Sequence, residues 1–91
     1  MSSSAGGSEA DFPRRYSQAL GEDLGDDEAE MLLELAREVA HRTERRFAPL
    51  STFAAGRFVA SRVAEGTTAI DALTDAVEVA LALLAEDAEP R

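Results

Sequence analysis

The segment HRTERRFAPLSTF, residues 41–53, holds the side chains whose chemistry is most distinctive in this 91-residue chain. It contains the only histidine, His41, and three of the nine arginines. Guanidinium groups bind phosphates and carboxylates through paired hydrogen bonds, and an imidazole can serve as a general base. The segment therefore suggests anion binding, and proton transfer by His41 is a weaker hypothesis.

The basic residues are concentrated in a strongly acidic chain whose formal net charge is −9. Residues 37–62 hold six arginines against two glutamates, a balance of +4, whereas the rest holds three arginines against sixteen acids. Nucleic-acid binding needs a broad basic surface that neutralises phosphates. We therefore expect no nucleic-acid partner, and we expect the basic segment to carry any site.

Several kinds of site are absent from the sequence. There is no cysteine and only one histidine, so we expect no metal site and no disulfide. The chain has no glycine-rich phosphate loop, no nucleophile elbow and no paired catalytic carboxylate motif. We expect a protein that is not an enzyme and needs no cofactor.

No targeting signal is expected either. The opening residues, MSSSAGGSEA, lack the basic and apolar parts of a secretory signal. The most apolar segment, AVEVALALLA, is far shorter than the roughly 20 residues that span a membrane. We expect a cytoplasmic protein with no membrane partner.

Helical patterns position the basic segment. A first helix is predicted from about Phe12 to Leu20, capped by Asp11 and ended by Gly21. A second helix is predicted over residues 27–46, with a buried face at the spacing i, i+3, i+4 and i+7, made of Leu32, Leu35, Ala36 and Val39. His41 lies about 180° around this helix from Leu32, so it should point outward.

Pro49 predicts a turn near Phe47 and Ala48, because proline disfavours a helical residue before it. The third helix should then run from residue 50 or 51 to residue 65, with Ser51 and Thr52 as capping residues. It is apolar almost all round, which predicts a central helix. Gly56 within it predicts close packing against another helix.

A fourth helix is predicted to begin after Thr68, which caps it and with Asp71 three residues later makes a start similar to a capping box. Its inner stripe consists of Ile70, Leu73, Val77, Leu81 and Leu84, and Val79 and Leu83 widen the apolar face enough to suggest a homodimer or a partner. We predict an all-α fold, a compact bundle of about four helices over residues 11–86. Residues 1–10 should form a disordered tail and residues 87–91 a frayed C-terminus.

Two interpretations of the basic segment remain open. If Arg45 and Arg46 end one helix where the next begins, the unpaired N–H groups of the next helix could join them in holding an anion. Alternatively, the arginines only stabilise the negative end of their own helix. Arg37, His41 and Arg45, spaced four apart, could line one edge that meets an anionic partner, or could form an ordinary salt-bridged surface. The candidate binding residues are Arg37, His41, Arg45, Arg46, Pro49, Ser51 and Thr52.

The pattern LARxVAHxxERxxAPLSTFxxG, which runs from Leu35 to Gly56, resembles the signature of a small actinobacterial family of uncharacterised function. Members of that family lie beside, or are fused to the carboxyl end of, proteins similar to molybdenum cofactor guanylyltransferase. The resemblance implies an accessory role in nucleotide transfer onto molybdopterin, whose phosphates would suit an arginine-lined turn. It also marks Arg37, His41, Arg45, Pro49 and Thr52 as the positions to examine.

Two hypotheses follow. The first is a non-enzymatic helical module that docks on a molybdenum cofactor guanylyltransferase-like protein or binds a phosphate-bearing ligand. The second is a self-associating structural domain with no small-molecule ligand.

Overall fold

The computed structural model describes residues 11–88, and most of this part of the chain is helical. The helices are α2 (Phe12–Ala19), α3 (Asp26–Arg42), α4 (Phe47–Ala64) and α5 (Ala69–Ala88). No strand occurs between residues 11 and 88, which confirms the predicted all-α fold of four helices. The expected tail at residues 1–10 and the last three residues of the expected frayed end lie outside the described residues.

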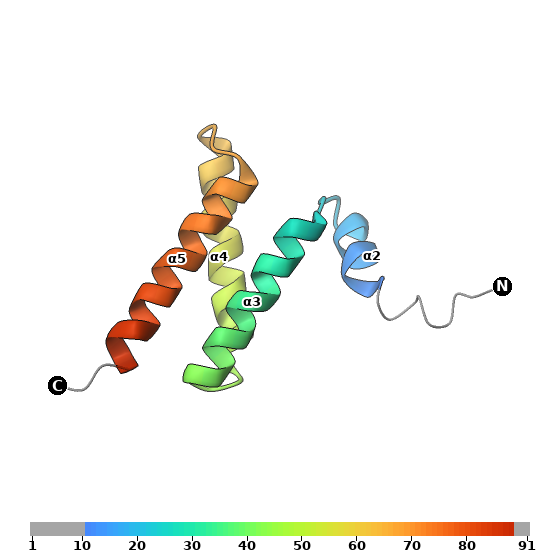
Figure 1. Ribbon diagram of the computed structural model, residues 1–91. Coiled ribbons are helices and arrows are strands. Elements are labelled where there is room, and N and C mark those ends of the chain that lie inside the picture. The colour runs from blue at the N-terminus through green and yellow to red at the C-terminus, as the bar shows by residue number, and fades with distance from the viewer. Residues whose placement is uncertain (1–10, 89–91) are drawn as a thin grey trace.

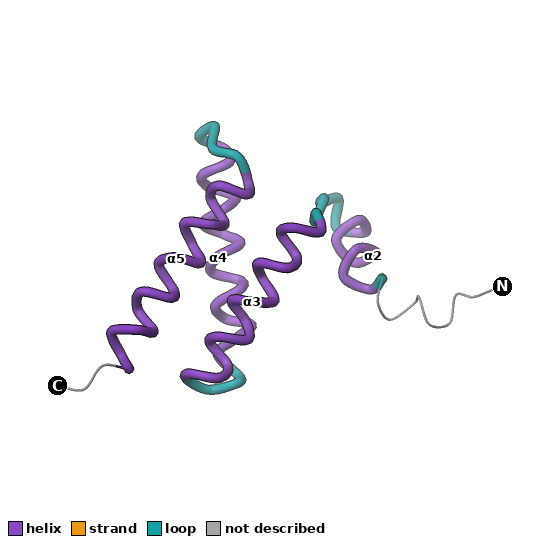
Figure 2. Tube along the Cα trace, in the orientation of Figure 1, coloured by secondary structure: helices purple, strands orange, loops and turns teal. Residues whose placement is uncertain are grey.

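Helices α3, α4 and α5 form a bundle in which each contacts the other two (Figure 1). Successive helices of the bundle run in opposite directions and are joined by short loops at residues 43–46 and 65–68 (Figure 2). Helix α2 stands apart, with no Cα within 8 Å of a Cα in the other three helices. The bundle therefore has three helices, and α2 is an appendage at the start of α3.

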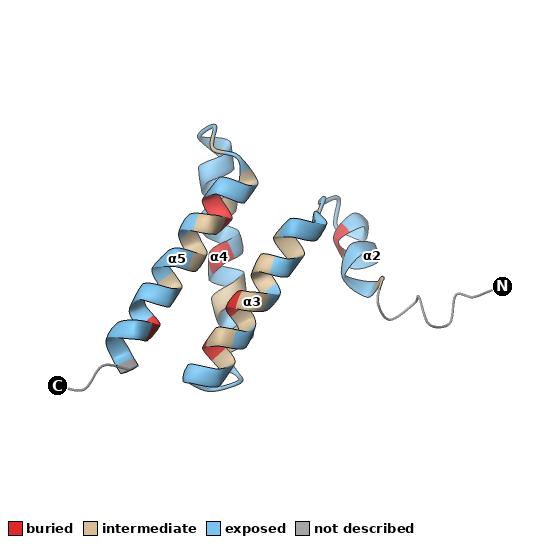
Figure 3. Ribbon diagram, in the orientation of Figure 1, coloured by how far each residue is buried: buried red, intermediate tan, exposed pale blue. Residues whose placement is uncertain are grey.

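The core lies where the three packed helices face one another (Figure 3). Leu35 and Val39 of α3, Ala55 of α4, and Leu73 and Leu84 of α5 are buried there. Side chains around them are partly buried: Met31, Leu32, Phe47, Val59, Ala76, Val77 and Ala80. The inner stripes predicted for the second and fourth helices thus supply most of the core.

Local sequence signals fix the starts of α3 and α5. The side chain of Glu28 accepts a hydrogen bond from the backbone N–H of Gly25 at 2.9 Å, and acids fill the first turn of α3. The Thr68 hydroxyl accepts one from the N–H of Asp71 at 3.1 Å, which confirms the predicted cap of α5. Gly66, with φ of 106°, ends α4 in a conformation that favours glycine.

The boundary between the second and third predicted helices was placed wrongly. Helix α3 ends at Arg42, four residues earlier than expected, because Thr43 leaves the helical conformation (φ −132°, ψ −119°). Its hydroxyl donates to the carbonyl of Val39 at 2.7 Å. Pro49 is the third residue of α4 rather than the residue after a turn. Proline is tolerated there because the N–H groups in the first turn of a helix have no partner within the helix.

Two predicted caps are also wrong, and a third residue, Asp11, holds the predicted cap position of α2 without the cap hydrogen bond. The Ser51 hydroxyl donates to the carbonyl of Phe47 at 3.0 Å, and the Thr52 hydroxyl donates to that of Pro49 at 3.1 Å, so both residues lie within α4. Asp11 makes no cap hydrogen bond and instead accepts one from Arg14 at 3.2 Å.

The prediction that the third helix is central is wrong. Ala55 is the one buried residue of α4, and Leu50 and Phe53 are each 66% exposed. A Cβ placed on Gly56 would meet nothing within 4 Å, so this glycine is not a packing contact. In a bundle of three helices each helix keeps an outward face, and the outward face of α4 is apolar.

Candidate functional site

The predicted edge of Arg37, His41 and Arg45 is interrupted. Arg37 and His41 lie one turn apart on the exposed side of α3, but Arg45 lies in the loop after the helix ends. The Arg37 guanidinium pairs with the carboxylate of Glu34. No hydrogen bond or ion pair orients the His41 imidazole within residues 11–88. Nothing there supports its use as a general base.

Arg45 and Arg46 lie together in the exposed loop before α4. Arg46 donates from Nε to the carboxylate of Glu44 at 2.9 Å, and its guanidinium carbon lies 5.3 Å from the centre of the Phe47 ring. One of the two loop arginines therefore already has an acidic partner and an aromatic partner.

The start of α4 offers fewer anion-binding N–H groups than the sequence suggests. The N–H of Phe47 donates to the carbonyl of Glu44 at 2.9 Å, and that of Ala48 to the carbonyl of Arg45 at 3.1 Å. Pro49 has no N–H. An anion at this loop would thus be held by guanidinium groups, with no help from the first three N–H positions of the helix.

Apolar side chains line a groove of about 340 Å³ between α4 and α5, with Leu35 of α3 at its base. Helix α4 contributes Ser51, Ala54, Ala55 and Phe58, and α5 contributes Ala76, Val79, Ala80 and Leu83. Val79 is 61% exposed and Leu83 is 55% exposed. Of the candidate residues from the sequence, Ser51 alone lines this groove.

The two helices that form the α4–α5 groove carry opposite charge. Helix α4 holds two arginines and no acid, although Arg62 pairs with Glu65 just after the helix at 3.7 Å, whereas α5 holds five acids and no base. The guanidinium of Arg62 lies 5.7 Å from the centre of the Phe58 ring, and that of Arg57 lies 5.8 Å from the centre of the Phe53 ring. Such stacking keeps a positive charge beside an exposed aromatic ring.

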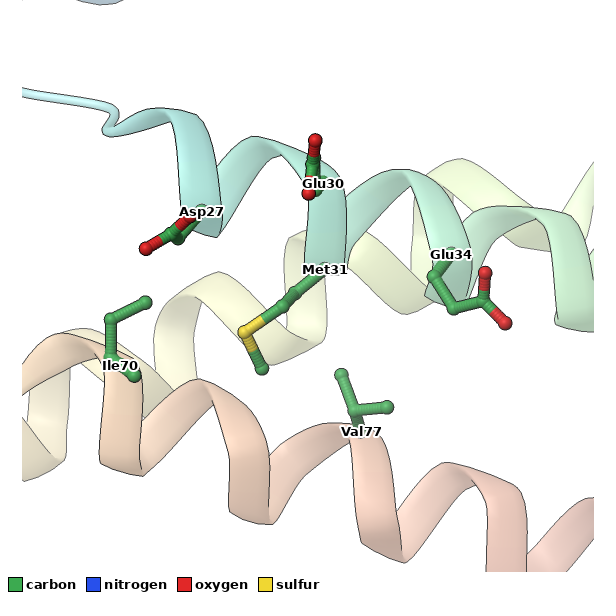
Figure 4. A pocket seen from close by; sticks show the side chains of 6 residues that line it. All are labelled: Asp27, Glu30, Met31, Glu34, Ile70 and Val77. Atoms are coloured by element: carbon green, nitrogen blue, oxygen red, sulfur yellow. The ribbon is translucent and has the colours of Figure 1, made fainter.

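A second groove, of about 480 Å³, lies between α3 and α5. Its floor is apolar, because Met31 of α3 points toward Ile70 and Val77 of α5 (Figure 4). Asp27, Glu30 and Glu34 follow one another along the α3 edge, at intervals of three and four residues. This acidic edge was not predicted, although the spacing of its three acids is visible in the sequence.

The exposed rings of Phe53 and Phe58 were not predicted either, because the third helix was expected to be central. The signal that could have predicted these exposed rings is the short chain, because in a bundle of three helices no helix is covered on all sides. Among residues 11–88 no three His, Asp or Glu side chains form a group that could hold a metal ion. No helix in this range is long and apolar enough to cross a membrane.

A family model for a domain of unknown function, DUF6457, matches residues 9–91 of the chain. The chain belongs to the DUF6457 family. The match supports the expected resemblance to a small domain family of unknown function. No curated protein and no solved structure matches this DUF6457 domain. Its function must therefore be inferred from the two grooves and the basic loop.

Proposed function

We propose that this domain is a non-enzymatic protein-binding module whose α4–α5 groove receives an amphipathic helix of a partner protein. The observation that carries the proposal is the exposed apolar surface of the groove, which includes Phe58, Val79 and Leu83. Contiguous apolar surface rimmed by charged residues is typical of interaction sites, and a groove between two helices suits a helical ligand.

The opposite charges of α4 and α5 beside the groove specify the partner helix. Acidic residues should flank its apolar stripe on the edge that meets Arg57 and Arg62 of α4. Basic residues should flank the stripe on the edge that meets Asp75 and Glu86 of α5. A helix with this charge pattern would bind in one direction only, because reversing it would place like charges together.

A molybdenum cofactor guanylyltransferase-like protein is the partner that the signature resemblance suggests. The basic loop lies one helical turn from Ser51, at the end of the groove, so a partner seated there could also contact Arg45 and Arg46. The phosphates of a nucleotide or of molybdopterin on that partner would suit these guanidinium groups. The proposed contact surface thus combines the apolar groove with the candidate residues Arg45, Arg46 and Ser51.

Binding of the purified domain to such a transferase can be measured by calorimetry, with a matched pair of variants. Leu83→Asp places a charge in the groove, whereas Leu33→Asp places the same charge on the outer face of α3. We expect Leu83→Asp to weaken binding about 30-fold or more, as for a central interface residue that contributes about 2 kcal/mol. Leu33→Asp should bind as the parent chain does.

NMR shift mapping separates the groove from the loop. Addition of the transferase should shift the signals of Phe58, Val79 and Leu83, whereas GTP alone should shift only those of Arg45 and Arg46. Equal weakening by both leucine variants, or no binding of the transferase at all, would refute the proposed role of the groove.

A further inference from the structure

Helix α2 exposes an apolar stripe that nothing in its own bundle covers. Phe12 and Tyr16 lie one turn apart and are 56% and 55% exposed, and their rings stack with centroids 5.8 Å apart. Leu20 continues the stripe one turn further and is also exposed. A short helix alone in water is marginally stable, so this stripe is best explained by a surface that packs against it.

The α3–α5 groove has the complementary chemistry. Its floor of Met31, Ile70 and Val77 is apolar, and its α3 edge carries three acids. Helix α2 contains two arginines, Arg14 and Arg15, and no acid, although Arg14 donates to Asp11 just before the helix. Contact between them would bury apolar side chains on both sides and bring opposite charges together.

The lengths also agree. The eight residues of α2 span about 12 Å, and the edge from Asp27 to Glu34 spans about 10 Å at 1.5 Å per residue. Within one chain, however, α3 stands between α2 and α5, so α2 lies on the side away from its own groove (Figure 1). The groove of a second copy has no such obstruction.

We propose that α2 of one chain docks in the α3–α5 groove of a second copy, and that the second copy returns the same contact. The exchange is a closed two-fold dimer, because each chain supplies one helix and one groove. Phe12, Tyr16 and Leu20 would meet Met31, Ile70 and Val77 of the other copy. This contact is independent of the α4–α5 groove, which stays free for a partner.

Charge reversal tests the proposal. Sedimentation of the full chain should show a monomer–dimer equilibrium. The pair Arg14→Glu with Arg15→Glu, and separately the pair Glu30→Arg with Glu34→Arg, should each weaken the dimer about 100-fold, since each places like charges together. Mixing the two variant chains should restore the dimer, because the mixed species pairs opposite charges in both contacts.

The control variant carries Asp75→Arg with Glu86→Arg, which changes the same amount of charge on α5 away from the α3–α5 groove. It should dimerise as the parent chain does. A parent chain that stays monomeric at millimolar concentration would overturn the proposal. So would a mixture of the two reversed chains that forms no dimer.

Disulfide trapping distinguishes exchange between chains from closure within one chain. The natural chain has no cysteine, so Tyr16→Cys with Met31→Cys gives two defined thiols. Oxidation should yield a covalent dimer on a non-reducing gel, whereas Tyr16→Cys with Leu33→Cys should yield at least tenfold less. A covalent link within a single chain, or no link at all, would refute the exchange.

Discussion

Gly56 lies in the middle of α4, where glycine is unfavourable, and Gly56→Ala should stabilise the domain. Glycine costs about 1 kcal/mol relative to alanine within a helix, mainly because it leaves the unfolded chain more freedom. The added methyl group would meet nothing within 4 Å, so no steric cost offsets this gain. The free energy of unfolding should rise by about 1 kcal/mol, and the midpoint temperature by about 4–8 °C in a domain of this size.

Urea unfolding followed by far-UV circular dichroism measures this change. The midpoint for Gly56→Ala should rise while the slope with urea stays constant. The control is Gly66→Ala, the same chemical change at a residue with φ of 106°, where it should cost about 1–2 kcal/mol. If Gly56→Ala leaves the midpoint unchanged or lowers it, another surface must occupy the space beside Gly56, and the account of α4 as outward-facing is wrong.

Further substitutions test the core, the caps and the surface pairs by the same urea titration. Leu35→Ala should lower the free energy of unfolding by about 2–5 kcal/mol, because Leu35 is 2% exposed, whereas Leu33→Ala on the outer face should change it by less than about 0.5 kcal/mol. Thr68→Ala should cost about 1 kcal/mol by removing the cap of α5. Glu34→Gln should cost less than about 1 kcal/mol, since its ion pair with Arg37 is exposed, and a larger loss would show that this pair supports the fold.

Features that depend on neighbouring residues were predictable from the sequence. The buried stripe of α3, with Leu35 and Val39, follows from its helical spacing, and the start of α5 follows from Thr68 and Asp71. The loop was misplaced because Pro49 is a strong helix breaker in most positions, yet it is tolerated within a first turn. Helix α3 instead ends at Thr43, and threonine in a sequence is a weaker indication of a helix end than proline.

Features that depend on how helices are placed in space were not predictable. An apolar surface all round α4 indicates burial only if enough helices surround it, and α2 does not join the bundle. The two grooves are each formed by helices that meet through tertiary packing, so no local pattern identifies them. The candidate residues Arg37, His41 and Arg45 shared a helical edge only while α3 was assumed to continue to residue 46.

The two four-residue loops of the bundle have a consequence for folding kinetics. Because each loop is short and most close residue pairs lie within single helices, local contacts dominate the bundle. Helical domains dominated by such local contacts fold within microseconds to milliseconds. Because α2 packs on none of these helices within its own chain, it should add nothing to the folding barrier. In dilute solution the bundle should therefore fold and unfold at the same rates whether Tyr16 is kept or replaced by alanine.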